Sequence, residues 1–180
     1  MIEEKELKKK IRNIPDFPKK GIMFRDITPL LQDPYTRDYV ILKIKEHFKG
    51  KKIDAVVCAE SRGFIFGAIL ADHLFCSFVP LRKPGKLPYK TVKEEFDTEY
   101  SKDAFEMHED GIKNGQNVLI VDDLLATGGT AEASCKLVEK LGGKIQGLAF
   151  VIDLTFLKGK EKLKDYDVFS VISYDSEEEI

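Results

Sequence analysis

Apolar runs that alternate with helical stretches constrain the fold of this chain more than any other feature. Strands are expected at the apolar runs Ile53–Ala59, Ser77–Arg82, Asn117–Asp122, Ile145–Asp153 and Val168–Tyr174. Helices are expected between them at Phe64–Leu74 and Thr130–Leu141. Runs that are apolar throughout, rather than at every second position, are typical of parallel strands buried on both faces. The sequence therefore predicts an α/β fold with a central, mostly parallel sheet flanked by helices, which binds its ligands at the carboxyl ends of the strands.

The segment before the first strand follows a different pattern. A charged surface helix is expected at Glu3–Arg12, and the prolines within residues 14–20 break it and lead into a loop. Asp33 and Pro34 suit the cap and the first turn of a further helix, which is expected to end near Gly50.

Length and charge exclude several classes of protein. The chain has 180 residues, with 29 Lys and Arg against 31 Asp and Glu, so its formal net charge is −2. This length is typical of one domain, and residues 1–180 are expected to form a single domain. The near-neutral charge argues against a nucleic-acid polymer as a partner, because DNA-binding chains usually carry a strong basic excess.

The sequence also indicates a cytoplasmic protein. No apolar run approaches the ~20 residues that span a bilayer, and the N-terminus lacks the apolar core of a secretory signal, so no membrane partner is expected. The three cysteines, Cys58, Cys76 and Cys135, are an odd number without a disulfide-framework spacing. Each lies in or beside an apolar segment, which favours reduced thiols in a cytoplasmic chain.

Two charged segments lie outside the alternation of strands and helices. Residues 83–116 contain Pro84, Gly85, Pro88 and dense charge, and they are too long for a typical connector. They are either a surface β-hairpin or a flexible flap over an active site; their position between strands that end in motifs favours the flap. The acidic tail Asp175–Glu179 is expected to be solvated charge.

The most informative motif is VLIVDDLLATGGT at Val118–Thr130. Glycines let backbone N–H groups turn toward a ligand, and the N-terminus of the following helix attracts anions, so the loop is suited to a terminal phosphate. Asp122 and Asp123, at the strand end, are placed to hold hydroxyls or the water shell of Mg²⁺. A ligand such as ribose 5-phosphate fits this spacing. The motif has neither the Gly-Lys-Ser/Thr of a Walker loop nor the G-x-G-x-x-G of a dinucleotide loop.

The same string resembles the motif of type I phosphoribosyltransferases that binds 5-phosphoribosyl-1-pyrophosphate (PRPP), in the form found in adenine phosphoribosyltransferases. Other stretches that resemble this family are Phe17–Leu31, Ala59–Gly67, Leu81–Leu87, Glu99-Tyr100 and Asp153–Gly159. The matches run in one order from about residue 14 to residue 174. The resemblance implies a type I phosphoribosyltransferase-like fold, with a flap near residues 83–116 and a small hood of N- and C-terminal segments over the base site. It further implies transfer of the 5-phosphoribosyl group from PRPP to adenine, which gives AMP and pyrophosphate in purine salvage.

The resemblance also implies which residues bind PRPP. The 5-phosphate would meet Ala126, Thr127, Gly128, Gly129 and Thr130, while Asp122 and Asp123 would face the ribose hydroxyls. Mg²⁺ would arrive with PRPP and contact these two acids through water, without direct protein ligands. The pyrophosphate would meet Ser61, Arg62 and Gly63, in a loop that often contains a non-proline cis peptide, expected here between Glu60 and Ser61. The family usually has Asp where this chain has Glu60.

A basic set follows the second strand. Arg82, Lys83 and Lys86 are either a solvated cationic face or further contacts to pyrophosphate. In related enzymes such residues reach the neighbouring subunit's site, so the resemblance implies a homodimer. Pro84 stands where relatives are often basic.

For the base and the proton chemistry, the resemblance points to the hood and the flap. Phe24 and Leu154 would sandwich adenine, and backbone and side-chain atoms of Met23 and Arg25 would read its edge. The alternative for Arg25 is a surface ion pair with Asp26. Glu99 would be the general acid or base, with Tyr100 beside it in the flap; the alternative is one more solvated acid in an acidic run.

Three rival functions fit the residues less well. A sister transferase for xanthine, hypoxanthine or orotate is disfavoured by Phe24-Arg25-Asp26 and Leu154. A PRPP-sensing regulator would normally carry an added DNA-binding domain, and only about 14 residues precede the first match. A phosphorelay receiver has its paired acids near the N-terminus, whereas 57 residues follow Asp123 here.

Overall fold

A parallel sheet of five strands forms the centre of the computed structural model, which describes residues 2–97 and 102–179. Its strands are β3 (Ala55–Ala59), β4 (Ser77–Leu81), β7 (Asn117–Leu125), β8 (Lys144–Leu154) and β9 (Val168–Tyr174). They lie in the order β4-β3-β7-β8-β9, and every neighbouring pair is parallel. This arrangement confirms the α/β fold that the continuous apolar runs predict.

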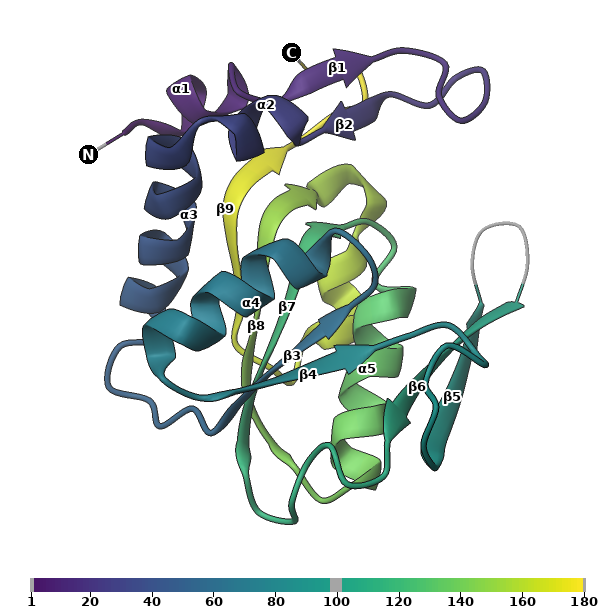
Figure 1. Ribbon diagram of the computed structural model, residues 1–180. Helices are drawn as coiled ribbons and strands as arrows, with labels where there is room; N and C mark the ends of the chain where they lie inside the picture. The colour runs from purple at the N-terminus through teal and green to yellow at the C-terminus, as the bar shows by residue number, and fades with distance from the viewer. Residues whose placement is uncertain (1, 98–101, 180) are drawn as a thin grey trace.

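Helices cover both faces of the sheet (Figure 1). The helices α3 (Pro34–His47) and α4 (Gly63–Leu74) pack on one face, against Val56 and Cys58 of β3. Helix α5 (Gly129–Lys140) packs on the other face, with Ala55 and Val57 in the same apolar cluster. Alternate residues of one strand thus enter two separate cores, as the two-residue period of a strand requires. Both cores are apolar, which explains why β3 is buried at every position.

The start of α3 has the expected cap. The side chain of Asp33 accepts hydrogen bonds from the backbone N–H groups of Tyr35 (3.1 Å) and Thr36 (3.3 Å). Pro34 occupies the first helical position, where its missing N–H costs nothing.

A small hood lies above the carboxyl ends of β7, β8 and β9 (Figure 1). It contains α1 (Glu4–Lys8), α2 (Thr28–Gln32) and the antiparallel strands β1 (Arg12–Ile14) and β2 (Phe24–Asp26). The predicted helix over Glu3–Arg12 is therefore too long: it ends at Lys8. Pairing of Arg12 with Asp26 across the two strands replaces the last helical turn, a tertiary contact that local propensity does not report.

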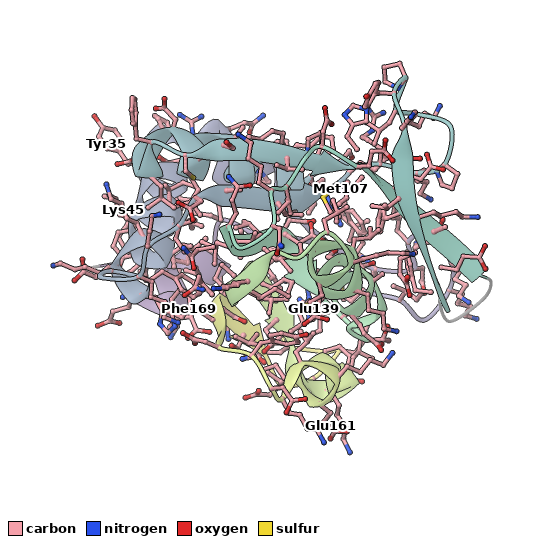
Figure 2. The ribbon with its side chains drawn as sticks, turned by 90° about the horizontal axis from the view of Figure 1, so that it is seen from below. Tyr35, Lys45, Met107, Glu139, Glu161 and Phe169 are labelled. Carbon is pink, nitrogen blue, oxygen red and sulfur yellow. The ribbon has the colours of Figure 1, made fainter. Side chains whose placement is uncertain are left out.

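The segment between β4 and β7 forms an antiparallel hairpin of β5 (Thr91–Asp97) and β6 (Lys102–His108). Phe105 and Met107 on β6 are buried in the core on the α5 side, and Figure 2 shows Met107 between the hairpin and the sheet. The hairpin interpretation of residues 83–116 is therefore confirmed, while the motion that a flap requires stays a prediction.

Two short 3₁₀ helices, η1 (Thr155–Leu157) and η2 (Gly159–Leu163), connect β8 to β9. Among the described residues, no helix is both long and apolar enough to cross a membrane.

The contact between α4 and β3 gives a first prediction. A Cβ added to Gly67 would lie 1.9 Å from the sulfur of Cys58, which is fully buried. We expect Gly67→Ala to lower the free energy of unfolding by about 1–3 kcal/mol, the usual cost of overpacking, in urea denaturation. Cys58→Ala in the same chain should recover part of the loss, because it removes the clashing atom. Equal stability of Gly67→Ala and the unchanged protein would contradict this packing.

Candidate active site

Two neighbouring cavities open at the carboxyl ends of the central strands. The first, of about 520 Å³, is lined by the strand end of β7, the start of α5 and the loop at Glu60–Arg62. The second, of about 360 Å³, lies under the hood and is mostly apolar. Arg62, Leu124 and Ala126 line both cavities, so a ligand that spans them would pass these residues.

The loop between β7 and α5 has the shape of an anion site. Residues 126–131 all line the first cavity, and α5 begins at Gly129 with N–H groups that have no partner within the helix. Gly128 has a φ of +81°, and a Cβ there would lie 2.6 Å from the carbonyl oxygen of Gly159. Only glycine fits this position, since both the backbone conformation and the space exclude a side chain.

The two acids near the end of β7 are buried side by side, which disfavours their charged forms. Asp122 Oδ1 accepts a hydrogen bond from the backbone N–H of Asp123 (2.8 Å), and Asp123 Oδ2 lies 2.7 Å from Arg62 Nε. Burial, and then the neighbouring Asp123, raise the pKa of Asp122 well above its usual range. Burial also raises the pKa of Asp123, while the Arg62 guanidinium opposes that change. A bound group with positive charge or hydroxyl donors would relieve this repulsion.

The loop after β3 lines the first cavity beside these acids. The peptide bond between Glu60 and Ser61 is cis, which confirms the expectation. A Cβ on Gly63 would lie 2.6 Å from Asp122 Oδ1, so glycine is needed where α4 begins beside the acid. Glu60 itself forms an ion pair with Arg82, whose backbone bridges to Glu106 on β6. Glu60, which is longer than the family's usual Asp, therefore connects the loop to the base of the hairpin through Arg82.

The rest of the basic set lies away from the two cavities. Lys83 Nζ pairs with Asp103 Oδ2 at 3.0 Å, and Lys86 donates its backbone N–H to the carbonyl of Lys83. Arg82, Lys83 and Lys86 line neither cavity in the single chain.

The second cavity collects the residues expected to bind a base. Met23, Phe24, Arg25 and Leu154 all line it. Phe24 is held from behind by Phe17, whose ring meets it edge-on with centroids 5.0 Å apart. The Arg62 guanidinium lies 5.1 Å from the Phe24 ring centroid, which places a cation between the apolar cavity and the anion site.

Comparisons with known proteins agree with this geometry. A family model described as "Phosphoribosyl transferase domain" matches residues 38–180. The chain is 53% identical over 170 residues to an adenine phosphoribosyltransferase of Methanococcus maripaludis, covering 94% of this chain and 99% of the relative. Another adenine phosphoribosyltransferase, from Christiangramia forsetii, is 54% identical over 169 residues, with the same coverage of both chains.

A solved structure shares both the fold and much of the sequence. The adenine phosphoribosyltransferase of Thermoanaerobacter pseudethanolicus superposes with a TM-score of 0.93 at 51% identity, covering 96% of this chain and all of the other. The chain belongs to the adenine phosphoribosyltransferase family. Its parallel sheet with a hood and a hairpin is accordingly a type I phosphoribosyltransferase fold.

Within this family fold, the Arg25 side chain is held by the hood and the C-terminal tail, beside the second cavity, hereafter the base cavity. Its guanidinium donates to Asn13 Oδ1 (2.5 Å) and to the carbonyls of Glu177 (2.9 Å) and Glu179 (2.7 Å). It also stacks over the ring of Tyr174, with Cζ 3.9 Å from the centroid, and the residue is only 2% exposed. The surface ion pair with Asp26 does not form, because Asp26 pairs with Arg12 (3.4 Å). The guanidinium of Arg25 is thus engaged by contacts within the protein, and its contact with a base stays a prediction.

Further residues complete the walls of the two cavities. Leu157 and Glu177 line the base cavity, and Gly159 supports the phosphate loop by its contact with Gly128. The expectation that the acidic tail is only solvated charge is wrong, because Glu177 and Glu179 are partly buried against the hood. The segment Asp153–Gly159, which resembles the family, includes Leu157 and Gly159, whereas nothing local marks Glu177. Glu99 and Tyr100 lie outside the described residues.

The acid pair gives a prediction about stability. Because folding raises the pKa of Asp122 above its ordinary 3.8, the charged form destabilises the fold, and this cost grows as the pH rises above 3.8. We expect Asp122→Asn, which keeps the Oδ1 acceptor, to raise the melting temperature at pH 7 by about 2–4 °C, equivalent to about 1 kcal/mol. The gain should shrink as the pH is lowered toward 4.5.

A matched control is Asp110→Asn, since Asp110 is exposed and lines neither cavity. It should leave the melting temperature unchanged at both pH values. A lower melting temperature for Asp122→Asn at pH 7 would show that the acid is not strained.

Proposed function

We propose that this chain transfers the 5-phosphoribosyl group from PRPP to adenine, giving AMP and pyrophosphate. The observation that carries the proposal is the junction of an anion cavity and an apolar, base-sized cavity at Arg62, Leu124 and Ala126. A nucleotide has these two parts, a phosphate and a flat base joined by ribose. Membership of the adenine phosphoribosyltransferase family supports adenine as the base. A related yeast enzyme, from Saccharomyces cerevisiae, was solved with adenine and an imino-altritol bisphosphate.

The anion cavity would hold the ribose 5-phosphate end of PRPP. Residues 126–130 would donate backbone N–H groups and the hydroxyls of Thr127 and Thr130 to the 5-phosphate. Asp122 and Asp123 would accept hydrogen bonds from the ribose hydroxyls, which stabilises the pair whose pKa values burial raises.

The same acids suit Mg²⁺ that enters with PRPP. Among the described residues, no group of three or more His, Cys, Asp or Glu side chains could form a metal site. Two adjacent carboxylates fit Mg²⁺ that keeps most of its water and takes its other ligands from a substrate. Bound there, Mg²⁺ would neutralise charge that builds up on the pyrophosphate.

The pyrophosphate would meet the loop that starts α4. Arg62 lines the cavity, and Ser61 and Gly63 flank it in a loop held by the Glu60–Arg82 ion pair. Lys83 and Lys86 lie too far along the surface to line this chain's own cavities, and we infer that they serve the neighbouring subunit of a homodimer. Fixed cations at the departing pyrophosphate lower the barrier to cleavage of its bond to C1.

The base would lie between Phe24 and Leu154. The backbone carbonyl of Met23 would accept a hydrogen bond from the exocyclic amine, and the backbone of Arg25 would meet the neighbouring ring edge. As the adenine nitrogen forms its bond to C1 and the C1–oxygen bond breaks, the ring nitrogen loses its proton, and Glu99 is the proposed acceptor. Tyr100 and the rest of the hairpin tip would exclude water that could hydrolyse PRPP.

We further propose that residues 1–180 act as one domain and that the protein works in the cytoplasm. One sheet carries both cavities, which supports a single unit. All three cysteines are free thiols, as a reducing compartment favours.

The proposal predicts selective turnover in a panel of bases. With PRPP and Mg²⁺, adenine should give AMP at a kcat/KM at least about a hundredfold above that for hypoxanthine or orotate, because acceptors placed for the exocyclic amine stay unpaired with the other bases. Product nucleotide is measured by chromatography. Turnover of another base without AMP from adenine would refute the substrate, and PRPP binding without any turnover would favour a regulator.

A second prediction concerns Glu99. Glu99→Gln should lower kcat by about 10²–10⁴-fold with the Kd for PRPP largely unchanged, since general acid–base catalysis acts on the chemical step. Glu109→Gln is the control, because Glu109 follows β6, is 44% exposed at its side chain and pairs only loosely with Lys90 at 3.9 Å. Equal kcat for Glu99→Gln and Glu109→Gln would reject the catalytic role.

A further inference from the structure

The C-terminal tail folds back onto the hood after β9. The Arg25 guanidinium donates hydrogen bonds to the carbonyls of Glu177 and Glu179 in this tail. It also donates one to Asn13 Oδ1 on β1. Because the guanidinium is almost completely buried, each of these hydrogen bonds is expensive to lose. The tail therefore follows a defined path beside β2, the strand that carries the base-binding segment.

Other contacts fix the same path from two further sides. Lys8 on α1 pairs with Glu179 Oε1 at 2.5 Å, and Glu179 Oε2 accepts the backbone N–H of Asp175 at 2.7 Å. The hydrogen bond from Lys8 lowers the pKa of Glu179. On the other side, Thr155 Oγ1 on η1 lies 2.6 Å from Asp175 Oδ1. The tail thus joins α1 to β2 and η1, and the last two contribute residues to the lining of the base cavity.

This path places the Glu177 side chain in the wall of the base cavity. Glu177 lines that cavity together with Met23, Phe24 and Leu154. Its Oε1 accepts a hydrogen bond from the backbone N–H of Met23. A hydrogen bond between an ionised acceptor and an amide is about twice as strong as a neutral one, so it holds the Met23 backbone in one orientation.

We propose that Glu177 is a positioning and specificity-determining residue of the base site. It fixes the Met23 backbone, and beside Met23 it leaves the cavity wall with hydrogen-bond acceptors only. The proposal rests on the function proposed above and deepens it. A carboxylate offers acceptors and no donor. The Met23 carbonyl beside it is an acceptor too.

The chemistry of the bases explains why such a wall selects adenine. The 6-amino group of adenine brings N–H donors to this end of the cavity. A 6-oxopurine brings a carbonyl oxygen to the same place, where it would face the Met23 carbonyl and the Glu177 carboxylate without a donor. Unpaired acceptors at close range cost binding free energy, so the wall selects adenine mainly by weakening the binding of a 6-oxopurine.

Two substitutions separate the two parts of the role. In Glu177→Ala the acceptor for Met23 is lost, so the KM for adenine should rise about tenfold, while kcat and the KM for PRPP stay within about twofold. In Glu177→Gln the amide oxygen can still accept from Met23, but its NH₂ group adds a donor to the wall. The KM for adenine should then rise less than about threefold, while the preference for adenine over hypoxanthine falls about tenfold.

The matched control is Glu178→Gln, because Glu178 is the neighbouring acid and is exposed. It should keep the unchanged protein's KM values and base preference. Unaltered KM and preference in Glu177→Ala would overturn the proposal. A fall in kcat with higher KM for both substrates would overturn it as well, since that pattern means general damage to the hood.

Failure of the proposed function would look different. The unchanged protein would then convert a base other than adenine, or none, before any variant is tested. The ratio of KM values between Glu177→Ala and the unchanged protein, measured with whichever base is converted, would still test the positioning role. Calorimetric titration with AMP gives the same comparison without turnover, and equal Kd values for the two proteins would overturn the positioning role.

Discussion

The close approach of two backbone segments, at Gly128 and Gly159, is the constraint on which the two cavities depend. The carbonyl oxygen of Gly159 occupies the space that a Cβ of Gly128 would fill, and a Cβ on Gly159 would in turn lie 2.3 Å from the carbonyl of Ala126. The turn after β8 therefore rests directly on the loop before α5. Leu154, at the end of β8, lines the base cavity, and the loop that follows β7 lines the anion cavity. The contact between the two turns therefore sets the distance between these cavities. A side chain at either glycine would separate the two halves of the site.

Electrostatics impose a second constraint at the same edge of the sheet. Asp122, Asp123 and Arg62 are close together, with opposite signs in contact at 2.7 Å. A net charge of −2 conceals this arrangement, since it reports a sum and not a distribution. Burial disfavours the charged form of Asp122 and raises its pKa. A ligand that brings hydroxyl donors to these acids would offset this cost, since functional sites commonly trade stability for activity.

The central sheet and its motif were predictable from the sequence because both depend on local patterns. The strand Val168–Tyr174 has the predicted bounds, and the cis peptide at Glu60–Ser61 is where the resemblance placed it. The hood was predicted less well. β1 and β2 are only three residues each, too short for a periodic pattern, and they exist because they pair with each other. Arg25 shows the same limit: the resemblance implied contact with a base, but its side-chain partners come from Asn13 and from the end of the chain.

The base cavity is built from segments that are far apart in the sequence, around residues 21–25, 154–157 and 177. A phosphate loop can be recognised from one string because the loop and the helix that follows it supply most of the donors. No single sequence motif specifies a base site, since a flat apolar ligand needs contacts on both faces and at its edge, from several segments. The chain forms those walls by bringing β2, η1 and the tail together through Arg25, Thr155 and Lys8. Substrate selection in this fold can therefore change through short terminal segments while the phosphate-binding loop stays the same. Glu177 of the tail is as much a part of this cavity's wall as Phe24 and Leu154.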